Sequence, residues 1–210
     1  MILIEKTFSI EDIDSIANDI AQALKFDSII SLSGEIGVGK TTLAQKIISK
    51  LMLNSKNYAN FKVNNHVLKN ASQHLVTDQD NLSKIPGYTD QNKNSANLQG
   101  KSNQDNAQGN VQENIIKYEI FEHINSPTFS FVNQYQCLVE GKECQLYHCD
   151  LYRIQDDSEL LELEIEENLG KGLFIIEWPE KIQSLLPNGT MVINISYLPD
   201  DTRLIKINYK

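Results

Sequence analysis

A glycine-rich stretch near the N-terminus, Gly34-x-x-x-x-Gly39-Lys40-Thr41, matches the phosphate-binding P-loop pattern in full. A β-branched run precedes the stretch and an amphipathic helical pattern follows it, which is the strand–loop–helix context that the pattern requires. Glycines in such a loop let consecutive backbone N–H groups point at phosphate oxygens, and the helix N-terminus adds the positive end of its dipole. We therefore expect a nucleoside triphosphate to bind here, rather than an ordinary glycine-rich turn.

The loop residues have separable expected roles. Lys40 is expected to reach the β- and γ-phosphates, and the hydroxyl of Thr41 to occupy one coordination position of Mg²⁺. Thr42 is a weaker contributor, while Glu35 and Ile36 occupy variable positions of the pattern. The expected nucleotide site comprises the loop and one residue outside it: Gly34, Glu35, Ile36, Gly37, Val38, Gly39, Lys40, Thr41, Thr42 and Trp178.

Two carboxylates at strand ends are the candidates for the metal side of this site. Glu177 ends the apolar run "LFIIE", and Asp150 ends "LYHCD". Each could hold Mg²⁺ directly or through water; the alternative is a solvated acid at a strand end. Trp178 is either a core residue or one that stacks on the base, and both readings stay open. For His148 we favour a satisfied structural residue over a base or ligand.

The elements that must position these residues follow from local patterns. A capping-box-like "SIED" from Ser9 predicts a helix, "DSIISLS" a strand, and "TTLAQKIISKLML" a second helix. Alternating runs around "VEGK" predict a β-hairpin, and "DSELLELEIEENL" predicts one polar-faced helix. A buried strand "GLFIIEW" and a second hairpin turning at 199–202 complete the chain. These elements predict a single α/β P-loop domain over residues 1–210, with three layers and a mixed β-sheet.

Residues 54–122 differ in composition and are predicted to be a low-complexity insertion within this domain. Over 89–114 the chain is rich in Asn and Gln and almost without apolar residues, so we expect that part to be largely disordered. A long insertion is tolerated because loop-closure entropy grows only with the logarithm of length.

Composition limits the possible partners and surroundings. The net charge of −9 argues against direct binding of nucleic acid, so we expect any RNA to be contacted only indirectly, through a partner. Three cysteines without a Cys-x-x-Cys pair indicate neither a zinc site nor a disulfide framework. We find no signal peptide and no apolar run of roughly 18 residues, and we expect a cytoplasmic protein that contacts no membrane. Without a guanine-reading Asn-Lys-x-Asp motif, ATP is favoured over GTP.

Four blocks in this order, "GEIGVGKTTL", "SPTFSFVNQY", "YHCDLYRI" and "LFIIEWPE", resemble the TsaE family over residues 5–53 and 124–210. The resemblance implies a P-loop ATPase of bacterial tRNA threonylcarbamoyladenosine, t(6)A, biosynthesis, which sustains turnover on ANN-reading tRNAs together with TsaB and TsaD proteins. It also implies a switch-like segment at 126–129 that sets Thr128 near the γ-phosphate and Mg²⁺.

The resemblance implies two sets of functional residues. The expected catalytic residues are Lys40, Asp150, Glu177 and Thr128, and the expected metal-side residues are Thr41, Glu177 and Asp150. Arg153 is either a partner or phosphate contact or a plain surface residue. The insertion departs from the family pattern, in which a link of about ten residues is typical.

Two other functions stay open at this stage. One is a nucleotide-gated binding module, in which ATP merely orders the 126–129 segment for docking. The other is a small-molecule kinase, which is disfavoured because such enzymes usually clamp substrates with several arginines and this chain has two.

Overall fold

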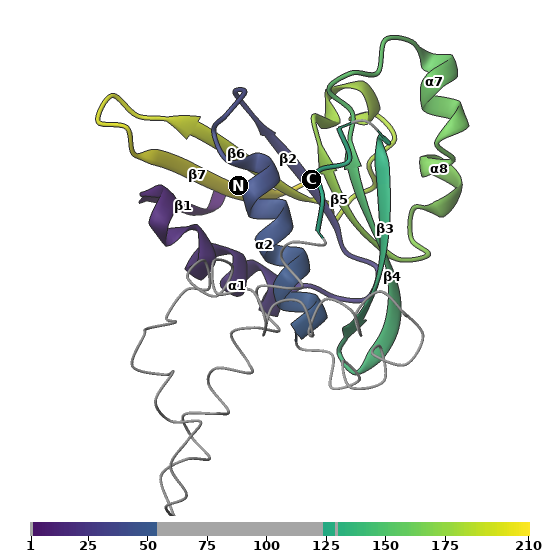
Figure 1. The fold of residues 1–210 in the computed structure, drawn as a ribbon, viewed down its shortest axis with the longest axis horizontal. Coiled ribbons are helices and arrows are strands. Elements are labelled where there is room, and N and C mark those ends of the chain that lie inside the picture. Colours follow the sequence, from purple (N-terminus) through teal and green to yellow (C-terminus); the bar gives the residue numbers. More distant parts are fainter. Residues whose placement is uncertain (1, 54–123, 129) are drawn as a thin grey trace, which may run out of the picture. The chain divides into compact units, whose positions relative to one another are not determined.

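The computed structural model describes residues 2–53, 124–128 and 130–210 (Figure 1). All of them belong to one compact unit formed by Met1–Ser55 and Ile124–Lys210. The predicted insertion over 54–122 lies outside the described residues. None of the described helices is long and apolar enough to cross a membrane.

A seven-stranded mixed sheet, in the order β1-β7-β6-β2-β5-β4-β3, is the frame of this unit. Strand β2 lies in the middle and pairs in parallel with β5 and with β6, and β5 also pairs in parallel with β4. The β1–β7, β6–β7 and β3–β4 pairs are antiparallel. This architecture confirms the predicted α/β class with a mixed sheet. The strands are β1 (Ile2–Phe8), β2 (Ile29–Gly34), β3 (Val132–Val139), β4 (Lys142–Asp150), β5 (Leu173–Glu177), β6 (Met191–Tyr197) and β7 (Arg203–Tyr209).

The N-terminal segment contains a strand that the sequence analysis did not identify. β1 runs antiparallel to β7 at the sheet edge. Ser9 then caps a short 3-10 helix, η1 (Ile10–Asp12), and its N–H and hydroxyl both donate to the Asp12 carboxylate, which confirms the capping box. Helix α1 (Ile13–Ala23) follows with one buried apolar face.

Helices cover the two faces of the sheet unequally. α1 and α2 (Lys40–Leu53) pack against each other and cover one face of the sheet (Figure 1). Residues of α1 line a pocket there together with Ile205 and Ile207 of β7. On the opposite face, the segments 151–169 and 179–186 cover β4, β5 and the start of β2 through a buried cluster that includes Phe174, Ile176 and Ile165. Because alternate residues of a strand point to opposite faces, the side chains of Leu173, Ile175 and Glu177 lie on the α1–α2 face.

The prediction of a single helix over "DSELLELEIEENL" is wrong. The chain forms two short helices, α7 (Asp157–Glu162) and α8 (Ile165–Asn168), separated by Glu164 in the left-handed conformation with φ 50°. After the break Ile165 lies in the apolar cluster, while Leu161 before it remains exposed. Burial of Ile165 in the tertiary structure therefore prevails over the local preference for one continuous helix.

Both predicted hairpins are present. Glu140 and Gly141 connect β3 to β4 with positive φ angles of 52° and 77°, as a two-residue type I′ turn requires. The β6–β7 connection closes through a hydrogen bond from the Leu198 N–H to the Thr202 carbonyl. A short 3-10 helix, η3 (Pro179–Ile182), follows β5 and returns the chain to the apolar cluster.

Candidate nucleotide site

The glycine-rich loop joins the end of β2 to the start of α2. Gly34 has φ 142°, and a Cβ at this position would lie 2.1 Å from the carbonyl oxygen of its β6 partner, Ile195. Gly39, at φ 113°, is also in the region that disfavours L side chains. Gly34 is thus required by the sheet itself, in addition to any role in binding phosphate.

Lys40 is held inside the loop. Its Nζ donates to the carbonyls of Gly34 and Glu35, both at 2.8 Å, and lies 3.8 Å from the centroid of the Trp178 ring. The residue is 5% exposed, and burial lowers the pKa of its ammonium, opposed by the charges of Glu177, Glu180 and Asp150. The ammonium therefore contacts two neutral carbonyl oxygens and an aromatic face within the loop. Phosphate oxygens can replace the carbonyl oxygens as its hydrogen-bond acceptors.

Thr41 and Glu177 meet at the base of the loop. The Thr41 hydroxyl donates to Glu177 Oε2 at 2.7 Å. A hydroxyl and a carboxylate oxygen side by side fit Mg²⁺, which usually takes few protein oxygens and completes its shell with phosphate and water. No cluster of three or more His, Cys, Asp or Glu side chains suited to a metal occurs within the described part of the chain. The arrangement thus fits a cation that the nucleotide helps to hold, not a dedicated protein cage.

Asp150 and Glu177 are direct neighbours in the parallel pairing of β4 with β5. Their side chains consequently lie on the same face of the sheet, at its carboxyl edge. His148, two residues before Asp150, shares that face, and its Nε2 lies 2.9 Å from Glu177 Oε1. The interpretation of His148 as a structural residue stays a prediction. Its ring contacts a candidate site residue through Nε2, and its Nδ1 is buried with no hydrogen-bond partner among the residues that the structure covers.

Thr128 connects the switch-like segment to the acids. Its hydroxyl donates to Asp150 Oδ2 at 2.9 Å and lies 2.5 Å from the Ser126 hydroxyl. The second oxygen of Asp150 accepts from the Tyr152 N–H at 3.1 Å. The Tyr152 ring in turn lies against Trp178, with centroids 4.9 Å apart. Both oxygens of Asp150 are thus occupied by groups of the site.

These residues surround one pocket of about 240 Å³. It brings together most of the predicted residues and adds Tyr152, which the sequence analysis did not identify. Three predicted loop residues do not line it: the Val38 side chain is fully buried, and Gly34 and Glu35 line a neighbouring pocket. Its lining is Ile36, Gly37, Gly39, Lys40, Thr41, Thr42, Thr128, Asp150, Tyr152, Glu177 and Trp178.

Arg203 supports the loop from the β6–β7 hairpin. Its Nε donates to the Val38 carbonyl at 2.9 Å, and its guanidinium lies 5.2 Å from the centroid of the Tyr197 ring. No local signal marks this residue, because the contact joins positions 165 apart in the chain. Arg203 is therefore a site component that sequence patterns could not identify.

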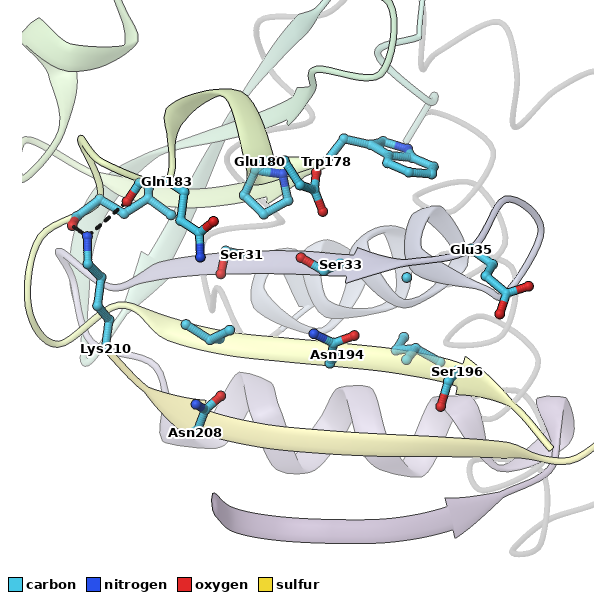
Figure 2. Close-up of a pocket in the computed structure, with 15 residues that line it drawn as sticks. Ser31, Ser33, Glu35, Trp178, Glu180, Gln183, Asn194, Ser196, Asn208 and Lys210 are labelled. Atoms are coloured by element: carbon cyan, nitrogen blue, oxygen red, sulfur yellow. Dashed lines mark hydrogen bonds between the residues drawn. The ribbon is translucent and has the colours of Figure 1, made fainter. Parts of the chain in front are cut away.

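The neighbouring pocket, of about 770 Å³, lies over the face of β2, β6 and β7 that α1 and α2 do not cover (Figure 2). Figure 2 shows Ser31, Ser33, Asn194, Ser196 and Asn208 along its floor, with Trp178 and Glu180 above. At one end Lys210 donates to the carbonyls of Gln183 and Leu186. Trp178 thus separates a polar sheet face from the P-loop pocket.

Comparisons with known proteins agree on one family. The profile of the family described as "Threonylcarbamoyl adenosine biosynthesis protein TsaE" matches residues 7–74 and 109–205. Two proteins named tRNA threonylcarbamoyladenosine biosynthesis protein TsaE are similar to the chain. The one from Rickettsia bellii is 42% identical over 95 residues, 44% of this chain and 63% of the relative. The one from Bacillus subtilis is 39% identical over 82 residues, 39% of this chain and 49% of the relative.

The chain therefore spans less than two thirds of the length of these relatives. Among solved structures, the crystal structure of Bacillus subtilis YdiB superposes with a TM-score of 0.49 at 19% identity, covering 99% of this chain and 86% of that one.

Proposed function

The chain belongs to the TsaE family, and from that membership we propose that it is a Mg²⁺-dependent ATPase required for t(6)A modification of ANN-reading tRNAs. In this proposal it hydrolyses ATP in a complex with TsaB and TsaD proteins, and so sustains their turnover. The observation that carries the proposal is the hydrogen bond between Thr41 of the P-loop and Glu177 at the end of β5, beside the ammonium of Lys40.

The loop and Lys40 bind the triphosphate in this mechanism. Lys40 Nζ exchanges its two carbonyl acceptors for β- and γ-phosphate oxygens, and a charged acceptor makes the stronger hydrogen bond. Backbone N–H groups of Gly37 and Gly39 surround the phosphates, and the N-terminus of α2 faces them. These groups orient the γ-phosphate toward the acids at the sheet edge.

The metal side consists of Thr41 and Glu177. Their oxygens would hold Mg²⁺, and the bound ion would supply neutralisation of charge on the phosphate oxygens. Asp150 lies beside Glu177 and accepts from Thr128, so it is suited to orient a water molecule or to support the metal side of the site. Thr128 belongs to the 126–129 segment, so its bond to Asp150 would couple that segment to nucleotide binding in the pocket.

The positions of the two arginines support the proposal that ATP hydrolysis depends on a partner protein. The chain has two, Arg153 and Arg203. Arg203 already donates to the loop carbonyl of Val38, and the P-loop pocket is lined by neither. Because an arginine finger commonly accelerates phosphoryl transfer by about 10³ or more, we expect slow hydrolysis by the isolated protein. The net charge of −9 further supports contact with tRNA through the partners alone.

Steady-state ATP hydrolysis with Mg²⁺, measured for the protein alone and with a TsaB and TsaD pair from the same source, tests the proposal. We expect a clear rise with the pair, abolished by Lys40→Ala and kept by Lys50→Ala, a lysine of the same helix that bonds to Asp14 at the surface. Unaided turnover of about tens per second would contradict partner dependence. Binding and turnover unchanged in Lys40→Ala would reject the phosphate-loop assignment.

A nucleotide-gated binding module is the second candidate, because the Thr128–Asp150 hydrogen bond links the switch-like segment directly to the pocket. In that case ATP would order the segment for docking and hydrolysis would be dispensable. A complex that forms and supports repeated t(6)A synthesis with a non-hydrolysable ATP analogue would favour the module over the ATPase.

A further inference from the structure

His148 is a buried polar residue with one unpaired ring nitrogen. The residue is fully buried in β4, and its Nδ1 has no hydrogen-bond partner in the described part of the chain. An unpaired buried polar atom costs stability relative to an apolar side chain of similar shape. A role in packing alone therefore does not account for the imidazole.

The other ring nitrogen faces Glu177. Nε2 lies 2.9 Å from Oε1 of that carboxylate, which is itself 1% exposed. A carboxylate oxygen accepts, so Nε2 carries the proton and donates, which leaves Nδ1 as a bare acceptor. That tautomer avoids burying an unsatisfied N–H.

Glu177 is consequently held from two sides. Oε1 accepts from His148 on β4, and Oε2 accepts from Thr41 at the start of α2. A cation bound to the Thr41 hydroxyl oxygen would use a lone pair and leave the O–H able to donate to Oε2, while the bond from His148 would keep the carboxylate aimed at the loop. Positioning partners of this kind commonly change metal affinity by about 10- to 100-fold.

We infer that His148 is a positioning residue that fixes the carboxylate of Glu177 for the metal-bound nucleotide, without touching nucleotide or metal. The inference rests on the proposed function, because it takes Glu177 as the metal-side acid. Three variants separate it from a packing role. His148→Gln keeps an N–H donor at similar reach, His148→Leu removes the donor, and Cys149→Ala trims a fully buried neighbour on the opposite face of β4.

The measurement is the affinity for a non-hydrolysable ATP analogue, with Mg²⁺ and in excess chelator, together with the thermal unfolding midpoint. For the unmodified protein, His148→Gln and Cys149→Ala we expect tighter binding with Mg²⁺. For His148→Leu we expect the ratio of the affinities with and without Mg²⁺ to fall by about tenfold or more. The affinity measured in chelator should stay within about twofold of that of the unmodified protein. Equal loss of affinity with and without Mg²⁺, or equal losses in His148→Leu and Cys149→Ala, would reduce His148 to a structural residue.

Three further outcomes keep the test decisive. If His148→Leu does not fold, His148→Asn replaces it, because its shorter amide does not reach Glu177; equal Mg²⁺ gains in the Asn and Gln variants would overturn the inference. If the unmodified protein gains nothing from Mg²⁺, the proposed metal site is wrong and the inference is overturned with it. A gain that survives intact in His148→Leu overturns the inference alone.

Discussion

Thr41 and Glu177, 136 residues apart in the chain, are joined by a 2.7 Å hydrogen bond from the Thr41 hydroxyl to Glu177 Oε2. The pair connects the first turn of α2 to the end of β5. This bond joins the phosphate loop to the sheet edge that carries Asp150 and Glu177.

Replacing Thr41 tests this connection. Thr41→Val keeps the shape but removes the hydroxyl, so we expect the Mg²⁺-dependent part of nucleotide affinity to fall by about 10- to 100-fold. Thr41→Ser retains the hydroxyl and should stay within about threefold of the unmodified protein. Calorimetric titration with and without Mg²⁺ measures both, and equal behaviour of the two variants would show that the hydroxyl does not contribute.

Gly34 is predicted to matter for folding before it matters for binding. A Cβ there would meet the Ile195 carbonyl at 2.1 Å, and the φ of 142° disfavours any L residue. We expect Gly34→Ala to lower the free energy of unfolding by about 3 kcal/mol or more, measured by urea denaturation. Gly141→Ala is the matched control, because its φ of 77° is also positive but nothing lies within 4 Å. It should cost only about 1 kcal/mol.

Arg203 is predicted to act through the backbone of the loop. Its Nε donates to the Val38 carbonyl and so holds the peptide between Val38 and Gly39. We expect this bond to keep the Gly39 N–H available to a bound phosphate. Arg203→Met should weaken nucleotide binding by about tenfold, equally with and without Mg²⁺. Lys206→Met, on the same strand and paired at the surface with Glu5, serves as the control. Affinity unchanged in Arg203→Met would mean that the loop keeps its shape unaided.

The buried ammonium of Lys40 predicts a pH dependence of stability. Burial lowers its pKa below the ordinary value of 10.5, so between the folded and unfolded pKa values the unfolded chain binds more protons. The contribution of Lys40 to the free energy of unfolding therefore rises with pH through a window that ends near 10.5. Denaturation from about pH 8 to about pH 10 should show the unmodified protein gaining on Lys40→Met. A constant difference would contradict this.

Short-range patterns account for much of what the sequence alone established. The P-loop, its flanking strand and helix, the Ser9 capping box and both hairpins depend on residues a few positions apart, and the structure contains all of them. Such patterns also predict Lys40, Thr41, Asp150 and Glu177 as site residues, and all four line one pocket in the structure. Their catalytic and metal-binding roles stay predictions.

Tertiary packing decided the remaining features. The β1 edge strand forms on β7, at the other end of the chain, and the break at Glu164 exists because Ile165 is buried in the apolar cluster. His148 meets Glu177 only through the register of β4 with β5, and Arg203 meets the loop only through the β6–β7 hairpin. Local sequence specifies which elements form because their hydrogen bonds and side-chain periodicity are local. The choice of partner for a buried polar group depends on strand order and register, which distant burial sets.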